Sequence, residues 1–393
     1  GVSMDLRFTA KQDAFRREAR SWLAQNVPAR PLPPMDTPDG FERHREWEGV
    51  LHEARWSVVS WPEAYGGREV GLVEWLIFEE EYDRSGAPGR VNTNGISLLG
   101  PTLFAFGTPE QQDRFLPRMA SGEEIWAQGW SEPDAGSDLA AISTRGVRDG
   151  EWFVLDGQKT WCSRGAWADW LFCIVRTDPT SERHTGLSYL LVPADSPGIE
   201  RRPVGRLDGE PAFADVFFDC CRVHESNLLG GEGDGWSVAM ATTSSERGLN
   251  LRAPGRFLAA ADRLAGLCRE SMAAGDERVD AGLVDEVVAA LIGARAYRWQ
   301  TYRTAARLEA GGLLGSASSM MKVFWSELDL ELHATALRLL GSRGELVADA
   351  PGAVDGGSWL SGYLFALAGP IYAGTNEIQR NIIAERVLGL PRR

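Results

Sequence analysis

Hydrophobic positions recur at helical spacing along the first part of the chain. Phe8, Phe15 and Trp22 mark one face of the segment near its start, while Arg16 lies largely off that face. This spacing is typical of an amphipathic helix that packs one side against a core. The pattern continues to about Ala120, so we predict a helical N-terminal part.

The pattern changes beyond Ile125, where short apolar segments are separated by Gly, Pro and Asp. These segments are rich in aromatic and β-branched residues, which favour strands. Four of them predict antiparallel strands: WFVLDG, WLFCIVRTD, GLSYLLVPA and AFADVFFD. We expect this small β-domain to end near Leu229.

Helical periodicity returns at Trp236 and continues through the rest of the chain. Its interruptions leave about four long helices, enough for a bundle. The interruptions lie at Pro254, at Ala273 to Gly275, at Gly311 and Gly312, and at 350–357.

The three patterns together predict an α+β fold that is mostly α-helical. We expect an N-terminal helical domain over residues 4–122, a middle antiparallel β-barrel-like domain over 123–229, and a C-terminal four-helix bundle over 230–393. The chain has 393 residues, of which 44% are hydrophobic, so it can bury a large core in two or three packed units.

Charge and cysteine usage narrow the class of protein. The chain has 55 acidic and 41 basic residues and a net charge of −14, which argues against a nucleic-acid partner, because phosphate binding needs clustered positive charge. No apolar run is long enough to span a bilayer. The five cysteines are an odd number without CxxC spacing, so we expect them reduced and the protein cytoplasmic. The histidines show no spacing that suits a metal site, so no metal is expected.

The candidate chemistry lies in two segments that combine indole rings, small hydroxyl residues and glycines. They are IWAQGWSEPDAGSD, from Ile125 to Asp138, and GQKTWCSRGAWADW, from Gly157 to Trp170. Such residues suit a flat aromatic ligand that forms hydrogen bonds. The alternative is a β-domain whose tryptophans fill its own core.

These two segments resemble the middle domain of the acyl-CoA dehydrogenase family. Further blocks follow in the family's order, namely PGI, VFFDCCRVHESNLLGGEGDGW and PIYAGTNEIQRNIIAERVLGLP, so the resemblance covers nearly the whole chain. It implies an FAD cofactor, an acyl-CoA substrate and an electron-transfer flavoprotein as electron acceptor. It also implies a homodimer or homotetramer, with a hetero-oligomer as a further possibility. Acyl chain length, branching, a steroid side chain and a carrier-protein thioester all remain open.

The reaction that the resemblance implies needs a base for the α-proton of the thioester and an acceptor for the β-hydride. Many members carry the base in a Y-E-G-T motif, which here reads Tyr372-Ala373-Gly374-Thr375 and offers no carboxylate. A second branch, with isovaleryl-CoA and long-chain acyl-CoA dehydrogenases, places a glutamate before an arginine on the first helix of the C-terminal bundle. Glu246 is therefore the candidate base and Arg247 helps to order it. The alternative for Glu246 is a solvated helix charge.

The backbone N–H of Ala373 can still polarise the thioester carbonyl, because that role needs no side chain. Ser137 matches a position near the phosphate-pantetheine arm of CoA, although a plain turn serine is as good an interpretation. Thr375 could equally begin the last helix as its cap. The positions that the resemblance assigns to the cofactor are Gln128, Trp130, Ser131, Trp161, Ser163, Arg278, Thr375 and Glu377.

Two blocks depart from the family pattern for elements that a neighbouring subunit lends to the cofactor. The R-x-x-F-G block reads Arg278 to Gly282 and lacks the aromatic residue, and the Q-x-x-G-G-x-G block reads Arg338 to Gly344, with arginine for glutamine and serine for the second glycine. A second hypothesis is therefore a partner subunit of a hetero-oligomer that is incompetent alone. A third keeps the fold but acts as a flavin oxidase.

Overall fold

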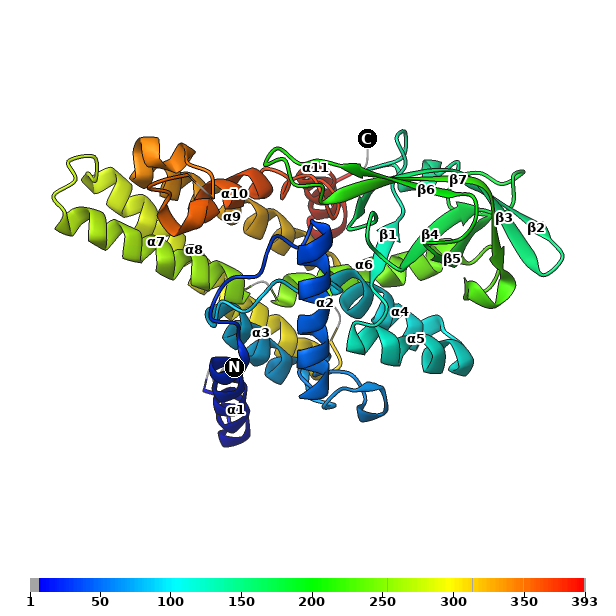
Figure 1. Ribbon diagram of the computed structural model, residues 1–393, viewed down its shortest axis with the longest axis horizontal. Coiled ribbons are helices and arrows are strands. Elements are labelled where there is room, and N and C mark those ends of the chain that lie inside the picture. Colours follow the sequence, from blue (N-terminus) through cyan, green and yellow to red (C-terminus); the bar gives the residue numbers. More distant parts are fainter. Residues whose placement is uncertain (1–6, 253, 313, 349, 392–393) are drawn as a thin grey trace. The chain divides into compact units, whose positions relative to one another are not determined.

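A computed structural model of the chain describes residues 7–252, 254–312, 314–348 and 350–391, with the side chains of 244–252 and 317 outside the description. The chain forms two compact units (Figure 1). Unit 1 comprises Gly1–Val27, Gly71–Ala87 and Leu249–Arg393, and unit 2 comprises Pro28–Val70 and Pro88–Gly248. Each unit therefore gathers segments that are far apart in the sequence. The expected domain boundaries after residues 122 and 229 stay a prediction.

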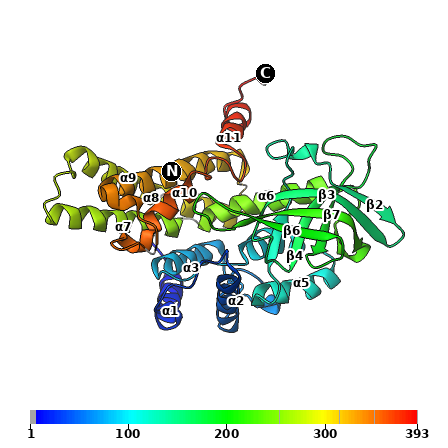
Figure 2. The ribbon, with the colours of Figure 1, turned by 45° about the horizontal axis from the view of Figure 1, so that its top comes forward.

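Unit 1 is helical, and its core forms between long helices. Helices α7, α8 and α9 pack side by side, and α3 packs on α7 and α8 (Figure 2). Phe257, Ala294 and Leu332 lie fully buried at these contacts. The helices are α1 (Ala10–Asn26), α3 (Leu72–Arg84), α7 (Pro254–Ala273), α8 (Ala281–Glu309), α9 (Ser318–Leu340), α10 (Ser358–Ala366) and α11 (Asn376–Ile382), with short turns η5 (Gly315–Ala317), η6 (Gly341–Glu345), η7 (Val354–Gly357) and η8 (Ile383–Val387).

Three of the four predicted helix breaks in this region are confirmed. The break predicted at 350–357 is wrong for the end of α9, which stops at Leu340 because Gly341 has a left-handed φ of 57°. Helix α6 (Gly235–Arg252) ends before Pro254, α7 ends at Ala273, and α8 ends before Gly311. The predicted four long helices, α6 to α9, are confirmed as elements. Proline and glycine explain the ends, because proline lacks the N–H that a helix needs and Gly311 has a left-handed φ of 81°.

The N-terminal helix begins with a capping box. The Thr9 hydroxyl accepts from the Gln12 N–H at 3.2 Å, and the Gln12 side chain accepts from the Thr9 N–H at 2.9 Å. Helix α1 then packs on α3, where Arg16 and Arg20 form ion pairs with the buried Glu81 at 2.8 Å. The helix predicted from Phe8 and its spacing is confirmed, and it belongs to the same unit as the C-terminal helices.

Unit 2 is built on a mixed sheet with the strand order β6-β7-β3-β2-β4-β5-β8, in which β1 also pairs with β4. All four predicted strands are present, as β3, β4, β5 and β7. Most pairs are antiparallel, as predicted, but β1 and β2 each pair with β4 in parallel. The strands are β1 (Trp126–Gly129), β2 (Arg145–Asp149), β3 (Trp152–Ser163), β4 (Trp170–Arg176), β5 (Leu187–Pro193), β6 (Ile199–Val204), β7 (Phe213–His224) and β8 (Leu228–Leu229).

Helices complete unit 2. They are α2 (Pro38–Glu53), α4 (Gly100–Phe106), α5 (Pro109–Ser121) and the part of α6 up to Gly248, with short turns η1 (Glu63–Tyr65), η2 (Gly95–Leu99), η3 (Leu139–Ala141) and η4 (Glu225–Asn227). Helix α5 begins with a second capping box, in which Thr108 and Gln111 exchange hydrogen bonds. Within the described ranges, none of the helices combines the length and hydropathy that crossing a bilayer requires.

Candidate functional site

The two tryptophan-containing segments meet in unit 2. Strand β1 ends at Gly129, and the chain continues through Trp130 and Ser131 beside the end of β3. The Thr160 N–H donates a hydrogen bond of 2.8 Å to the Ser131 carbonyl oxygen and ties the segments together. The structure thus brings together the residues that the sequence placed in one ligand site.

Trp161 is the unusual residue of this surface. Its residue surface is 60% exposed, whereas Trp126 and Trp130 are buried at 1% and 5%. Its φ of 58° lies in the left-handed region, where the register of β3 against β7 shifts between Lys159 and Cys162. Such a backbone costs an aromatic residue on the order of 1–3 kcal/mol, and strain of this kind gathers at functional sites. The core-filling alternative therefore holds for Trp126 and Trp130 but is wrong for Trp161.

The indole of Trp161 is held edge-on against Phe213, with ring centroids 5.6 Å apart and an interplanar angle of 86°. Phe213 also pairs with Ser163 across β3 and β7. An exposed indole that rests on a second aromatic ring keeps its open face fixed for another flat ring.

Polar side chains of the same two segments remain available to a ligand. Gln128, Ser131 and Ser163 are half-buried. Throughout the described part of the chain, their side chains form no hydrogen bond or ring contact with another residue. A ring face beside open amide and hydroxyl groups fits a flavin ring, which is flat and forms hydrogen bonds along its edge. We call Gln128, Ser131, Trp161 and Ser163 the platform.

A buried ion pair joins the two segments that carry the platform. Lys159 is fully buried, and its Nζ donates to Glu132 Oε1 at 2.7 Å, to the Trp130 carbonyl oxygen at 3.1 Å and to the Ile174 carbonyl oxygen at 2.7 Å. Lys159 therefore joins β3 to both the Trp130 segment and β4. Neither residue of this ion pair stands out in the sequence, because a single charge in a strand pattern is usually solvent-exposed.

The carboxylate of Glu132 accepts four hydrogen bonds. Its oxygens accept from the Ser143 N–H and hydroxyl at 2.7 Å and from the Thr144 N–H at 2.9 Å, besides Lys159. Burial alone would raise the pKa of this carboxyl, but the charge and hydrogen bond of Lys159 and the other donors outweigh burial and lower the pKa to about 2. Glu132 is thus ionised at neutral pH.

The remaining residue predicted near the platform lies at the surface. Ser137 is exposed in the turn before η3, beside Asp138, which forms an ion pair with Arg183 at 3.1 Å. These surroundings fit a turn serine and leave its expected contact with CoA a prediction.

The residues expected near the thioester and the cofactor also include a loop of unit 1. Ala373 and Gly374 are two successive left-handed residues with φ of 55° and 81°. Thr375 then caps α11, since its hydroxyl accepts from the Ile378 N–H at 3.2 Å, so the helix-start interpretation of Thr375 is confirmed. Glu377 is exposed in the first turn of that helix.

The two blocks that differ from the family pattern, Arg278 to Gly282 and Arg338 to Gly344, both lie in unit 1. The Arg278 guanidinium pairs with Asp276 at 2.6 Å and 2.9 Å and donates to the Leu340 carbonyl oxygen at 3.2 Å. Hydrogen bonds from Arg278 lower the pKa of Asp276 to about 2. Arg338 forms an ion pair with Glu286. Both arginines of the altered blocks therefore already have carboxylate partners within this chain.

Two expected catalytic residues cannot be placed at the level of side chains. Glu246 and Arg247 fall within α6, on the helix where the sequence predicted them, but their side chains lie outside the described residues. The assignment of Glu246 as base stays a prediction.

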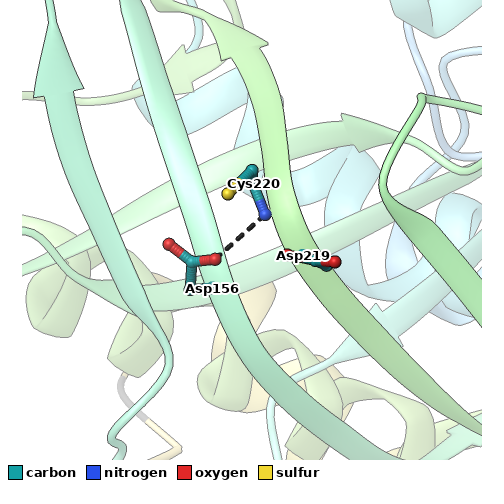
Figure 3. A group of neighbouring side chains, drawn as sticks. All are labelled: Asp156, Asp219 and Cys220. Carbon is teal, nitrogen blue, oxygen red and sulfur yellow. Dashed lines mark hydrogen bonds between the residues drawn. The ribbon is translucent and has the colours of Figure 1, made fainter.

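A different cluster lies on the exposed side of β3 and β7, where Asp156, Asp219 and Cys220 offer ligand-type atoms within 4.8 Å of one another (Figure 3). The Cys220 N–H donates to Asp156 Oδ1 at 2.9 Å, and Cys220 has a left-handed φ of 49°. The neighbouring carboxylates of Asp156 and Asp219 raise the pKa of the Cys220 thiol, which disfavours the thiolate that a metal would need. In the part of the chain that is described, nothing else points to an ion there, and we assign the cluster no function.

Comparison with protein families gives three consecutive matches that cover most of the chain. Residues 9–123 match the acyl-CoA dehydrogenase N-terminal domain, 127–221 the middle domain and 233–388 the C-terminal domain. Acyl-CoA dehydrogenase IpdE1 of Mycobacterium tuberculosis is 41% identical over 389 residues, which span 97% of this chain and 98% of the relative. Acyl-CoA dehydrogenase FadE26 of the same organism is 32% identical, over 99% of both chains.

Solved structures agree with this similarity. The steroid ACAD Tcur3481-Tcur3483 has a TM-score of 0.88 at 28% identity and covers 99% of this chain and all of its own. The ChsE4-ChsE5 complex from Mycobacterium tuberculosis has a TM-score of 0.85 at 31% identity, with coverage of 99% and 100%. Both structures are named for two proteins.

Proposed function

Because the chain belongs to the acyl-CoA dehydrogenase family of oxidoreductases, we propose that it uses FAD to form a double bond between the α and β carbons of an acyl-CoA thioester. The observation that carries the cofactor assignment is the platform. The exposed indole of Trp161 has a left-handed backbone that a core-filling tryptophan would not need, and the same two segments carry open hydroxyl and amide groups. Both features support the binding of a flavin ring.

When bound, FAD supplies the acceptor for the hydride that leaves the β carbon. The chain's own residues bind and orient it. Gln128, Trp130 and Ser131 hold the ring from one segment, and Trp161 and Ser163 hold it from β3. The proposed cofactor-binding set also includes Arg278, Thr375 and Glu377.

The proton chemistry rests on α6 and on the loop before α11. Glu246 removes the α-proton, and Arg247 keeps that carboxylate in place. Ala373 has no titratable group, so it acts through its backbone N–H, which polarises the thioester carbonyl and makes the α-proton acidic. Support for Glu246 comes from its sequence position and from the alanine at the family's other base position.

The test of this mechanism is anaerobic mixing of the FAD-loaded protein with acyl-CoA. Glu246→Gln is expected to keep FAD and to lose flavin bleaching by at least about 100-fold, since general base catalysis contributes that much. Glu270→Gln, an exposed glutamate on α7, is the matched control and should bleach at the normal rate. Rapid bleaching in Glu246→Gln would remove this residue from the mechanism.

For the substrate, we propose a bulky acyl-CoA of the steroid type, since one of the similar structures is that of a steroid ACAD. Ser137 is proposed to contact the phosphate-pantetheine arm. A panel of steroid, branched and straight-chain acyl-CoAs ranks the substrates by the rate of anaerobic bleaching. Faster bleaching by straight-chain thioesters than by steroid thioesters would overturn this choice. An electron-transfer flavoprotein is the proposed acceptor, and rapid reoxidation of the reduced protein by air would instead favour a flavin oxidase.

A second candidate function is a subunit of a hetero-oligomer that is inactive alone. The specific observation is that Arg278 and Arg338 are engaged by Asp276 and Glu286, while the aromatic residue of the first block is missing. A chain with such blocks has less to offer a neighbour's cofactor. Purification of the chain by itself tests this idea: a colourless protein supports it, and a yellow, active homo-oligomer excludes it.

A further inference from the structure

A buried lysine of α9 bridges the loop between α10 and α11. Lys322 is 3% exposed, and its Nζ donates to the Gly369 carbonyl oxygen at 2.9 Å and to Asn376 Oδ1 at 2.8 Å. These two acceptors stand at the start and at the end of the loop. Lys322 therefore bridges both ends of the segment that carries Ala373.

The far end of this bridge is itself held firmly. Asn376 is 2% exposed, and its amide N–H donates to Ser326 Oγ at 3.1 Å, one helical turn after Lys322 on α9. The Asn376 backbone N–H donates to the Pro370 carbonyl oxygen at 2.8 Å, which closes the loop a second time. Substitution of Lys322 thus removes a connection that no other cation supplies in the described residues.

The middle of the loop is strained and has an open donor. Ala373 and Gly374 are both left-handed, and Gln379 Nε2 approaches their carbonyl oxygens at 3.4 Å and 3.3 Å. In the described ranges, the Ala373 N–H donates no hydrogen bond. A non-glycine residue keeps such a backbone only where the surrounding structure holds it in place.

The choice of lysine at this position carries information. The chain has only three lysines among its 41 basic residues, namely Lys11, Lys159 and Lys322, and the last two are buried. Arginine therefore serves nearly every other cationic position. A compact ammonium with three donors fits between two oxygens where a planar guanidinium does not.

Keeping a cation here is unfavourable for the charge itself. The two acceptors are neutral oxygens, and within the described residues no carboxylate lies at ion-pair distance from Nζ. Burial lowers the pKa of Lys322 to about 8, partly opposed by Glu377, while Arg380 lowers it further and Glu327 raises it. The ammonium of Lys322 is therefore not stabilised by an opposite charge, and its two hydrogen bonds to Gly369 and Asn376 are the reason to keep it at this position.

We propose that Lys322 is a positioning residue: by closing the loop from Gly369 to Asn376, it fixes the direction of the Ala373 N–H toward the thioester carbonyl. This inference rests on the proposed function for the target of that N–H. The role of Lys322 in the loop does not depend on it.

The first experiment measures amide hydrogen exchange in the FAD-loaded protein, for the peptide that spans residues 369–376. In Lys322→Met, exchange in this peptide is expected to rise by at least about tenfold, because the loop loses one of the two connections between its ends and the remaining one, from the Asn376 N–H to the Pro370 carbonyl oxygen, opens more often. Lys11→Met makes the same change at an exposed lysine of unit 1 and should leave the peptide unchanged. Unchanged exchange in Lys322→Met would overturn the proposal.

The second experiment separates positioning from folding by steady-state kinetics with the acyl-CoA that bleaches the wild-type flavin fastest. Lys322→Met is expected to bind FAD normally and to keep KM within about threefold, while kcat falls by about 10- to 100-fold, since misplacement of one donor by about 1 Å has an effect of that size. An equal loss of FAD affinity, or a change in KM alone, would contradict the positioning role.

If Lys322→Met does not fold, Asn376→Ala removes the other half of the bridge and is expected to give the same pattern in both measurements. The two proposals fail in different ways. A wild-type protein whose flavin no acyl-CoA reduces would overturn the proposed function, while the exchange measurement still decides whether Lys322 holds the loop.

Discussion

Each unit of the molecule buries one lysine, and the two surroundings differ in a single feature. Lys159 in unit 2 pairs with the carboxylate of Glu132 at 2.7 Å, whereas Lys322 in unit 1 donates only to the neutral oxygens of Gly369 and Asn376. Both lysines join segments that are distant in sequence. The first is compensated in charge and the second is not.

This difference separates two uses of the same side chain. The compensated lysine forms an ion pair and joins β3 to the Trp130 segment and to β4. An uncompensated ammonium is tuned by burial to a pKa of about 8, close to neutral pH. Burial alone therefore does not determine how a buried lysine responds to pH and mutation, because the charge of its acceptors decides the response.

The largest effect is expected for Lys159→Met. This change leaves Glu132 charged and buried without its cation, which costs about 3–5 kcal/mol. Chemical denaturation should therefore show a clear loss in the stability of unit 2. The double variant Lys159→Met with Glu132→Gln is the control and should recover part of the loss. A single variant as stable as the wild type would show that the pair contributes nothing.

Acid titration tests the compensated site next. The pKa of Glu132 is about 2 in the folded protein, below its ordinary value of 4.5. The unfolded chain thus binds more protons as the pH falls, so the stability from Glu132 is present above about 4.5 and decreases toward 2. The wild type should lose its advantage over Glu132→Gln by about 1.4 kcal/mol per pH unit in this window. Denaturation at pH 6, 4.5 and 3.5 measures the difference, and a constant gap would contradict the shift.

The uncompensated lysine should respond to pH in the opposite range. The pKa of Lys322 is about 8 in the folded protein, below its ordinary value of 10.5, so unfolding takes up a proton between these values. The stability of the wild type relative to Lys322→Met is then expected to rise with pH from 8 to 10.5, by up to about 1.4 kcal/mol per unit. Thermal unfolding of both proteins at pH 7.5, 9 and 10 measures this difference in stability, with Lys11→Met as the control. A difference that does not change with pH would contradict the prediction.

The smallest effect on stability is expected at the platform. Trp161→Gly removes an exposed ring and relieves its left-handed φ of 58°, so the change in unfolding free energy should stay within about 1 kcal/mol. FAD affinity should fall by about 2- to 10-fold, since a lost ring contact is worth about 0.5–1.5 kcal/mol. A titration of the protein with FAD, monitored by flavin fluorescence, measures this affinity. Undiminished affinity would show that Trp161 has no part in the cofactor site.

Much of the fold could be predicted from hydrophobic periodicity, because long helices and half-buried strands each require apolar residues at a characteristic spacing. Four strands, β1, β2, β6 and β8, were not predicted, and β6 shows one physical reason. Strand β6 reads IERRPV, with the exposed residues Glu200, Arg202 and Pro203, and the apolar pattern gave no sign of it. Strand β6 lies at the edge of the sheet. An edge strand can carry charged residues and tolerates proline, so it lacks the apolar alternation by which the other strands were predicted.

The site was predicted less completely, for a physical reason. Composition identified the segments of Ser131 and Trp161, but the exposure of that indole arises from a register shift against β7, a strand about 50 residues further along. The lysines at 159 and 322 went unassigned because a local pattern does not show which distant oxygens surround a charge. Glu246 stays a prediction in all respects beyond its helix.

The early helices of unit 1 have a consequence for synthesis. Phe15 on α1 and Leu76 and Ile77 on α3 pack into a core that is completed by α7, α8 and α9. At about 5–20 residues per second, the ribosome needs on the order of ten seconds or more to deliver those partners after α3 has emerged. During that interval, while most of unit 2 is being translated, the apolar side chains of α1 and α3 that pack against the later helices stay exposed to solvent. Nascent chains of this protein are thus expected to require chaperone protection until the last long helix leaves the exit tunnel.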